Sequence, residues 1–333
     1  MKILHMQRAF TLLELIFVTV ILGIVASIGS SIVVQIYESY INQKAVHNAS
    51  LKTELAINQL ANRLTYRINR SLLARVPGTT DLVPTHATPL QGISLADSKT
   101  HTALEWIGYE NDGFTAQTVP RWSGFCDLNK SIFKQIRTTA SRLKTTSGAQ
   151  TSEQTILNNL SSRSPTPSPA IIFMGPANYR TGIPYDTLCM YKSGNQGCMF
   201  PVTFKNNITL SFKKAGNTGD RAAGQMIYSE FYQLAASAYA VVPERDASVG
   251  SLGVNGGSML TPDVEVWNIY LYSDYQPWNG DNYLNGSKSL LAKNVSVLRF
   301  RNEMNSIRIK ICSSEKVGDT DTISICKEKA VIR

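Results

Sequence analysis

The sequence has none of the short residue patterns that most protein metal sites require. Its five cysteines form no Cys-x-x-Cys pair, and no histidine lies close in sequence to any of them, so zinc-finger spacing is absent. No EF-hand pattern is present either, so we interpret the acidic loop residues as solvated turn residues rather than calcium ligands; they are Asp274, Asp281, Asp319 and Asp321. We therefore expect no metal and no cofactor.

Recognisable catalytic groups are also missing. An enzyme requires a nucleophile, a base or a metal cluster in a suitable context, and the sequence shows none. His86 and His101 lie in polar stretches that we expect to be exposed, and nothing in the spacing pairs either with Cys126 as a thiol dyad. The glycines between Ser248 and Ser258 follow no clear strand, which favours a loop over a phosphate site. The sequence thus predicts a protein that is not an enzyme.

The charge balance is basic but shows no concentrated patch. Lys and Arg number 33, Asp and Glu number 24, and the formal net charge is +9, a balance that favours nucleic acid or an anionic membrane as a partner. However, the basic residues occur in short groups interleaved with apolar residues, as on the solvent face of strands; one group contains Arg299, Arg301, Arg308 and Lys310. A solvated face is the simpler interpretation, and nucleic-acid binding stays an alternative.

The apolar residues are concentrated near the N-terminus. Residues Met1 to Ala9 carry basic side chains and no acid, which is typical of a cytoplasmic flank. From Phe10 to Val34 the only ionisable side chain is Glu14, and a helix rising about 1.5 Å per residue would cross the roughly 30 Å apolar layer of a membrane once. The segment therefore predicts a single-pass inner-membrane protein whose head lies in the periplasm.

Glu14 separates several interpretations of this apolar segment. A cleaved secretory signal or a plain signal anchor has no use for a carboxylate that costs on the order of a few kcal/mol to bury in a membrane. A local explanation also exists, because Thr11-Leu12-Leu13-Glu14 fits a capping box with Thr11 as the N-cap. That local contribution stays open beside any role in assembly.

The junction Arg8-Ala9-Phe10-Thr11-Leu12-Leu13-Glu14 resembles the leader junction of type IV pilins and pseudopilins. In that family a prepilin peptidase cuts just before the phenylalanine and methylates the new amine. The resemblance implies cleavage between Ala9 and Phe10, although the family usually has glycine where this chain has Ala9. It also implies an assembly role for Glu14, whose carboxylate would neutralise the Phe10 ammonium of a neighbouring subunit inside an apolar filament core.

The remaining sequence predicts an α+β protein with a long helix packed on an antiparallel head. Leu60, Leu64, Ile68 and Leu72 form an apolar stripe at four-residue steps, so we expect a helix from Thr11 to about Ala74 with an amphipathic part over residues 35–76. Short strands are expected across residues 77–333, and the region 138–169, rich in Ser, Thr and Pro, is expected to be a mobile surface insertion. The expected strands are 104–109, 170–174, 200–204, 208–213, 264–272, 295–301, 306–312 and 322–326.

Four of the five cysteines are close enough in sequence to form local disulfides. The expected pairs are Cys189 with Cys198 and Cys312 with Cys326, which require an oxidising compartment and leave Cys126 over. Isoleucines alternate with polar residues on both sides of Gly318, and a turn there would place Cys312 opposite Cys326.

The resemblance implies a structural function. The chain would be a minor pilin or pseudopilin that initiates or caps a type IV pilus or a type II secretion pseudopilus, and its last strands are similar to those of J-type pseudopilins and PilW-like minor pilins. Its partners would be other pilins, the prepilin peptidase, the inner-membrane assembly platform and the inner membrane itself. One alternative is a tip adhesin or DNA-binding subunit for DNA uptake, and another is a membrane-anchored periplasmic enzyme.

Overall fold

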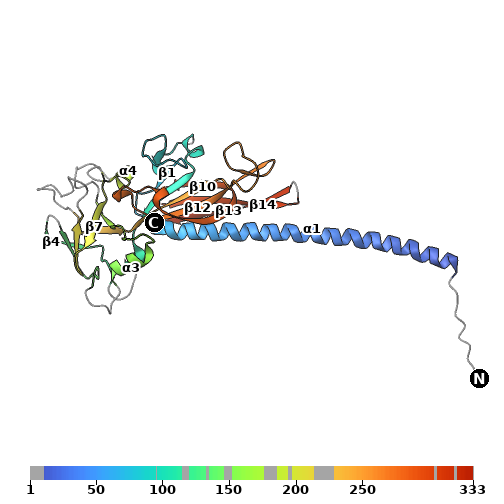
Figure 1. The fold of residues 1–333 in the computed structure, drawn as a ribbon, viewed down its shortest axis with the longest axis horizontal. Helices are drawn as coiled ribbons and strands as arrows, with labels where there is room; N and C mark the ends of the chain where they lie inside the picture. Colours follow the sequence, from blue (N-terminus) through green and yellow to red (C-terminus); the bar gives the residue numbers. More distant parts are fainter. Residues whose placement is uncertain are drawn as a thin grey trace, which may run out of the picture.

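A single long helix, α1 (Leu12–Thr65), precedes a head made mainly of strands (Figure 1). The structure, a computed structural model, describes residues 11–94, 96–114, 120–132, 135–145, 152–175, 186–193, 197–213, 229–303, 306–318 and 321–332. All strand pairs within the described residues are antiparallel. The expected α+β architecture, with an N-terminal helix followed by antiparallel sheets, is therefore confirmed.

The two halves of α1 lie in different surroundings. The N-terminal half projects away from the head, while the C-terminal half runs along the main sheet (Figure 1). Buried positions begin at Ala45 and recur as far as Leu64. The predicted continuation of this helix to Ala74 is wrong, because beyond Thr65 the backbone joins the sheet: the Ile68 amide donates to the Ile107 carbonyl at 2.8 Å. Residues 73–75 form a strand instead.

The main sheet has nine strands, eight of them in the order β15-β14-β13-β12-β10-β3-β1-β2, and β11 pairs with β12 outside this path. The strands are β1 (Leu73–Arg75), β2 (Ala87–Pro89), β3 (Ala103–Gly108), β10 (Ser237–Glu244), β11 (Ser258–Thr261), β12 (Val264–Tyr275), β13 (Ser287–Glu303), β14 (Ser306–Val317) and β15 (Asp321–Ile332). Short 3-10 helices lie in the connections: η1 (Leu90–Gly92), η2 (Asp97–Lys99), η5 (Pro277–Asn279) and η6 (Tyr283–Asn285).

Both faces of the main sheet are covered. On one face, Leu60 and Leu64 of α1 belong to the same buried cluster as Ile307, Ile309 and Ile311 of β14. A second cluster joins residues of β3, β10 and β12 with buried residues from the chain between β3 and β10. That second cluster includes Ala170, Ile172, Met190, Cys198, Met199, Ala238, Val242, Tyr275 and Trp278. The sheet is therefore sandwiched between α1 and a second layer.

The second layer comes from a large insertion in the main sheet. Gly108 of β3 and Ser237 of β10 are paired neighbours, yet the chain between them supplies a separate six-stranded sheet in the order β4-β5-β8-β7-β6-β9. Its elements are α2 (Asn111–Phe114), β4 (Cys126–Ile132), β5 (Gln135–Thr138), α3 (Glu153–Leu160), β6 (Ala170–Phe173), α4 (Thr187–Met190), β7 (Phe200–Phe204), β8 (Thr209–Phe212) and β9 (Tyr232–Ala235).

The six-stranded sheet closes on itself. Phe125 and Phe231, which precede the two edge strands β4 and β9, form an antiparallel bridge, and the Cys126 amide donates to the Glu230 carbonyl at 2.8 Å. Apolar side chains from all six strands fill the interior. We call residues 109–236 the inserted barrel. It lies at the head end of the molecule, beyond the C-terminal end of α1 (Figure 1).

The strand predictions hold for the most regular segments, whereas part of the expected surface insertion is buried. All eight predicted strands overlap observed ones, but β1, β2, β4, β5, β9, β10 and β11 were missed. The described part of region 138–169 is tied into the barrel rather than loose on its surface, since Leu143, Glu153 and Leu157 are buried. The short helix expected there is present as α3. The inserted unit is therefore larger and better packed than its composition indicates.

Candidate assembly surface on the N-terminal helix

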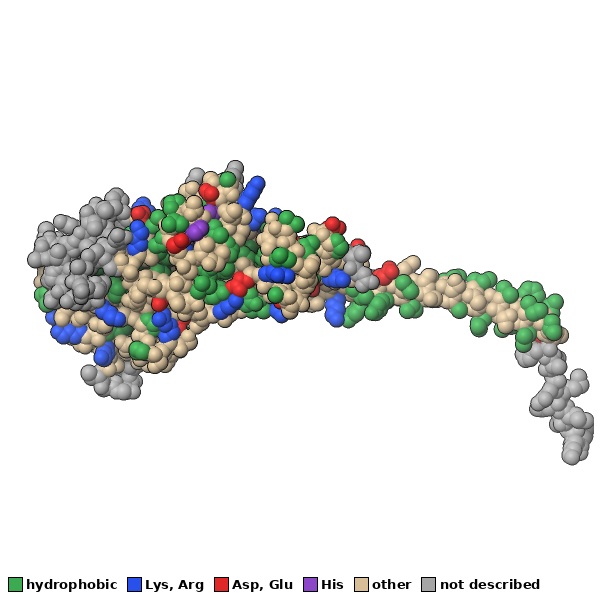
Figure 2. Space-filling model, turned by 45° about the horizontal axis from the view of Figure 1, so that its top comes forward, with side chains coloured by type: hydrophobic (Ala, Val, Ile, Leu, Met, Phe, Trp, Pro, Cys, Tyr) green, Lys and Arg blue, Asp and Glu red, His purple; other side chains and the backbone are tan. Residues whose placement is uncertain are grey.

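The projecting half of α1 presents apolar side chains on all sides. Every residue from Leu12 to Tyr40 is exposed, and a window of 18 residues reaches a mean hydropathy of 2.5 with none of it buried (Figure 2). By length and composition this is the one described helix that could cross a membrane. A water-exposed apolar surface of this size is unfavourable, so the segment needs lipid or other apolar helices around it.

The helix begins with a complete capping box. The Thr11 hydroxyl accepts from the Glu14 amide at 3.3 Å, and the Glu14 carboxylate accepts from the Thr11 amide at 3.4 Å and from its hydroxyl at 3.3 Å. The local role foreseen for Glu14 is therefore present in the isolated chain. All three contacts are long and exposed, so they leave the carboxylate available to a stronger donor. Ala9 and Phe10, the predicted cleavage pair, lie outside the described residues.

Small side chains let the second half of α1 lie close to the sheet. Ala45, Ala49, Thr53 and Ala56 are all buried, and the Thr53 hydroxyl donates to the Ala49 carbonyl at 2.6 Å, so no polar atom is left unsatisfied there. Further along the same face, the larger Leu60 lies in the core cluster between α1 and the sheet. The packing of these small residues against the sheet fixes the direction in which the projecting half of α1 leaves the head.

Polar contacts fasten the helix to the β14–β15 hairpin. Lys52 pairs with Glu315 at 2.5 Å, Lys327 pairs with Glu54 at 2.5 Å, and Lys329 donates to Asn58 at 2.8 Å. The Lys327 partner lowers the pKa of the Glu54 carboxyl. Because these contacts are solvent-exposed, each contributes little to stability, and their main effect is to set the helix register on the hairpin.

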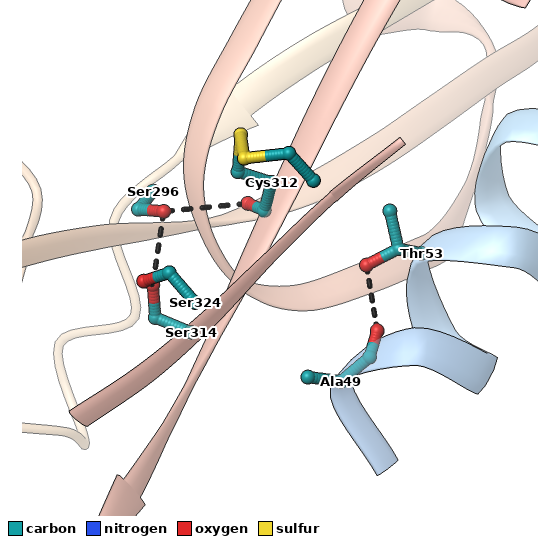
Figure 3. Close-up of a disulfide and its surroundings, with 7 residues drawn as sticks. Ala49, Thr53, Ser296, Cys312, Ser314 and Ser324 are labelled. Carbon is teal, nitrogen blue, oxygen red and sulfur yellow. Dashed lines mark hydrogen bonds between the residues drawn. A yellow bond between two sulfur atoms is a disulfide. The ribbon is translucent and has the colours of Figure 1, made fainter. Parts of the chain in front are cut away.

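Both expected disulfides are present in the structure. Cys189 bonds Cys198 next to α4, and Cys312 bonds Cys326 as direct partners on β14 and β15. Around the second bond, Ser314 donates to Ser296 and contacts Ser324 at 2.6 Å (Figure 3). The hairpin that receives α1 is therefore closed both covalently and through hydroxyl groups.

The basic group predicted on β13 and β14 is largely neutralised. Arg308 contacts Glu303 at 3.3 Å and Glu328 at 3.2 Å, and Arg301 lies 3.9 Å from Glu303. Arg299 donates to the backbone carbonyl of its neighbour Leu298. Alternating charges of this kind form a solvated face, as the sequence pattern indicated.

Several residues considered for chemistry have structural roles instead. Asp274 accepts from Ser161 and Ser162, and Asp281 pairs with Arg163 at 2.5 Å, so these two carboxylates hold the end of α3 on β12 and η5 rather than being solvated. Among the described residues no group of three or more His, Cys, Asp or Glu side chains could hold a metal ion. Asp321 is exposed, and Asp319 lies outside the described range.

The histidines and Cys126 are not arranged as a catalytic group. His86 contacts Asp81 at 2.7 Å on the surface, whereas His101 is 2% exposed, which corrects the expectation that it is solvated. Cys126 lies in the barrel interior, in an apolar cluster to which neither His86 nor His101 belongs. The glycine-rich loop is filled by the Glu265 carboxylate, which accepts from the Gly257 amide at 2.6 Å. A phosphate therefore has no room among those amides.

Sequence reasoning missed a buried acid pair where the barrel joins the main sheet. Glu110 follows β3 and lines a cavity of about 480 Å³ near the end of α1, and Glu153 is the first residue of α3. Burial, together with the facing Glu110 carboxyl, raises the pKa of Glu153 to about 10, and burial also raises the pKa of Glu110. The two acids stand 43 positions apart in the sequence, so no local pattern signals their contact.

Of the two acids, only Glu110 accepts hydrogen bonds from the described donors around the pair. The Glu110 carboxylate accepts from the Gly113 amide at 2.8 Å and from the Trp122 ring nitrogen at 3.0 Å. Among the described residues, no donor reaches either oxygen of Glu153, which is fully buried. A carboxyl group in such a place keeps its proton and donates a hydrogen bond to a neighbouring acceptor, here the Glu110 carboxylate. We interpret the acid pair as a structural contact between the end of β3 and the start of α3, because Gly113 and Trp122 hold the Glu110 carboxylate.

The comparisons with known proteins concern the N-terminal segment. Residues 4–30 match the family model described as the prokaryotic N-terminal methylation motif. The chain carries a pilin-type N-terminal motif. The methylation motif, the single long apolar helix and the antiparallel head are together consistent with a type IV pilin-like protein, and the motif points to a structural family. No curated protein and no solved structure matches the chain significantly.

Proposed function

We propose that the protein is a minor pilin or pseudopilin that initiates or caps a type IV pilus or a type II secretion pseudopilus. The observation that carries the proposal is the projecting half of α1, which contains most of the methylation motif and is apolar on all sides. Such a helix is suited first to the inner membrane and then to a bundle of similar helices. The head would then lie outside the cytoplasm, where the two disulfides are stable.

The position of the inserted barrel supports a place at a filament end. The barrel lies beyond the C-terminal end of α1, on the side opposite the projecting helix (Figure 1). In a filament whose subunits point their helices in one direction, this bulk would stand over the place that the next subunit occupies. A subunit of this shape fits the tip, where no further head has to follow.

Glu14 would act between subunits. Cutting after Ala9 creates an ammonium at Phe10, and a neighbouring subunit's Glu14 would exchange its weak local capping contacts for that ammonium. In the apolar interior of a filament each charge alone is costly, so their pairing would favour one helix register. The prepilin peptidase and the assembly platform are the other implied partners.

The first test is the N-terminal residue of the mature protein. Expressed in a cell that contains a prepilin peptidase, the purified chain should begin with N-methylated Phe10 when its N-terminal peptide is analysed by mass spectrometry. A chain that begins at Met1, or close to Ser30 as after signal-peptide cleavage, would contradict the proposal.

The second test separates assembly from helix capping. Glu14→Ala should leave cleavage intact but lower the amount of protein in sheared filaments by about tenfold or more, because the Phe10 ammonium would lack its partner. Thr11→Ala is the matched control, since it removes the local hydroxyl cap and keeps the carboxylate. Normal incorporation of the Glu14 variant, or equal losses in both variants, would mean that Glu14 only caps its helix.

A further inference from the structure

Most of the net positive charge of the chain belongs to the inserted barrel. Residues 109–236 contain 13 Lys and Arg against 7 Asp and Glu, which gives +6 of the total of +9. The long α1 and the nine-stranded sheet therefore contribute only the remaining +3. Figure 2 shows Lys and Arg side chains on the described part of the barrel end, and others along the rest of the head.

Three barrel strands place cations and hydroxyls in rows on the outer face. Arg137 of β5 is the direct partner of Thr209 on β8, and the Lys205 amide beside β7 donates to the Thr209 carbonyl at 3.0 Å. Both cationic side chains are exposed, while the alternate residues Ile136 and Leu210 are buried in the barrel. Because side chains alternate across a strand, Arg137, Thr209 and Lys205 form one outward row.

The neighbouring row is polar and extends the same surface. Gln135 pairs with Ser211, which pairs with Thr203, and the Lys205 ammonium donates to the Gln135 side chain at 3.4 Å. At the end of β8, exposed Lys213 donates its amide to the Pro201 carbonyl at 2.8 Å. We call the surface formed by Gln135, Arg137, Thr203, Lys205, Thr209, Ser211 and Lys213 the basic barrel face.

The cations of the basic barrel face have no acidic partners. Across the described residues, no carboxylate lies within 4.0 Å of Arg137, Lys205 or Lys213. Asp127 stands opposite Arg137 on β4, but it pairs with Lys130 at 3.0 Å. This differs from the β13–β14 face, where Arg301 and Arg308 lie beside glutamates.

We propose that the basic barrel face binds the phosphate backbone of nucleic acid without sequence preference. Phosphates are contacted chiefly by Arg and Lys together with Ser, Thr and Gln side chains, and this face presents those residue types in register. Its place at the end of the molecule opposite the apolar half of α1 keeps it away from the membrane that would hold that helix (Figure 1). The proposal goes beyond filament assembly and does not depend on it.

The experiment measures binding of the full chain in detergent to a fluorescent random DNA duplex of about 30 base pairs, between about 50 and 200 mM salt. Replacing Arg137, Lys205 and Lys213 together by Gln should weaken binding at least tenfold and reduce the log–log salt slope by about 2–3. The matched control replaces Arg299, Arg301 and Arg308 by Gln. It makes the same change in net charge and should weaken binding less than about threefold.

Three outcomes would overturn the proposal. They are no binding at the lowest salt, equal losses in the two triple variants, and tighter binding to dextran sulfate than to DNA. Equal thermal unfolding curves of wild type and both variants establish that a loss of binding is not a loss of folding. N-terminal processing provides a separate readout, so failure here leaves the assembly proposal to its own tests.

Discussion

The main sheet with α1 and the inserted barrel differ in how their charged side chains are paired. In the first region charged residues meet opposite charges, as Lys52 meets Glu315 and Arg308 meets Glu328. In the barrel, Lys130 pairs with Asp127, but none of the described carboxylates pairs with the outward cations Arg137 and Lys205, and no described donor reaches the buried carboxyl of Glu153. Matched surface charges suit a region that must keep one fixed shape, whereas unmatched cations leave a surface free to meet an anion. Under the two proposals, α1 serves filament assembly and the inserted barrel serves contact with nucleic acid.

The largest expected effect tests the packed half of α1 against its exposed side. Leu64→Ala, at a fully buried position in the helix–sheet core, should lower the free energy of unfolding by about 3 kcal/mol. Leu51→Ala on the same helix is 49% exposed and should change it by less than about 0.5 kcal/mol. Urea unfolding of the detergent-solubilised protein, followed by tryptophan fluorescence, measures both.

The same series tests whether sheet and barrel unfold together. Leu210→Ala removes a fully buried barrel side chain of the same size. Because a shared core cluster joins the two regions, both Leu64→Ala and Leu210→Ala should shift one common transition. Two separate transitions, each sensitive to only one variant, would show that the barrel folds as an independent unit.

The regular parts of the fold could be predicted because local pattern and tertiary environment agree there. Alternating isoleucines in β14 have one covered face, so a period of two is visible, and it also places Cys312 opposite Cys326. Strand β10 was missed because both of its faces are covered: Val241 faces the α1 cluster, while Ala240 and Val242 face the barrel side. A strand buried on both sides shows no alternation.

The boundaries that failed depend on distant contacts. Ile68 continues the four-residue stripe of α1, yet its amide pairs with Ile107 and leaves the helix. The polar strand β4 is held by its neighbour β5 and by the seam to β9, which no local propensity encodes. At the candidate site, Glu14 could be recognised from the sequence, because a carboxylate within an apolar run is costly in a membrane. The Glu110–Glu153 pair could not be recognised, because these residues come together only when the end of β3 packs against α3.

A smaller effect is expected in the pH dependence of stability, and it depends on Glu153, the buried acid of the barrel. The facing groups around Glu153 are Glu110, Asp112, Arg121 and the Tyr232 ring, and burial holds its pKa at about 10 against 4.5 in the unfolded chain. Between these values the folded state binds more protons than the unfolded state, so the stability contributed by neutral Glu153 declines as pH rises from about 5 towards 10.

Replacing Glu153 by Gln should remove this decline. The amide keeps the size of the side chain and can still donate to Glu110, so the variant should lose less stability than wild type between pH 5 and pH 8, by on the order of 2 kcal/mol. Thermal unfolding at a series of pH values measures the difference, and Glu230→Gln, at an exposed position before β9, serves as the control. Parallel stability curves for Glu153→Gln and wild type would mean that Glu153 is ionised in the fold. An ionised Glu153 would then need a counter-charge, and Arg121, whose charge lowers the pKa of Glu153, could supply it.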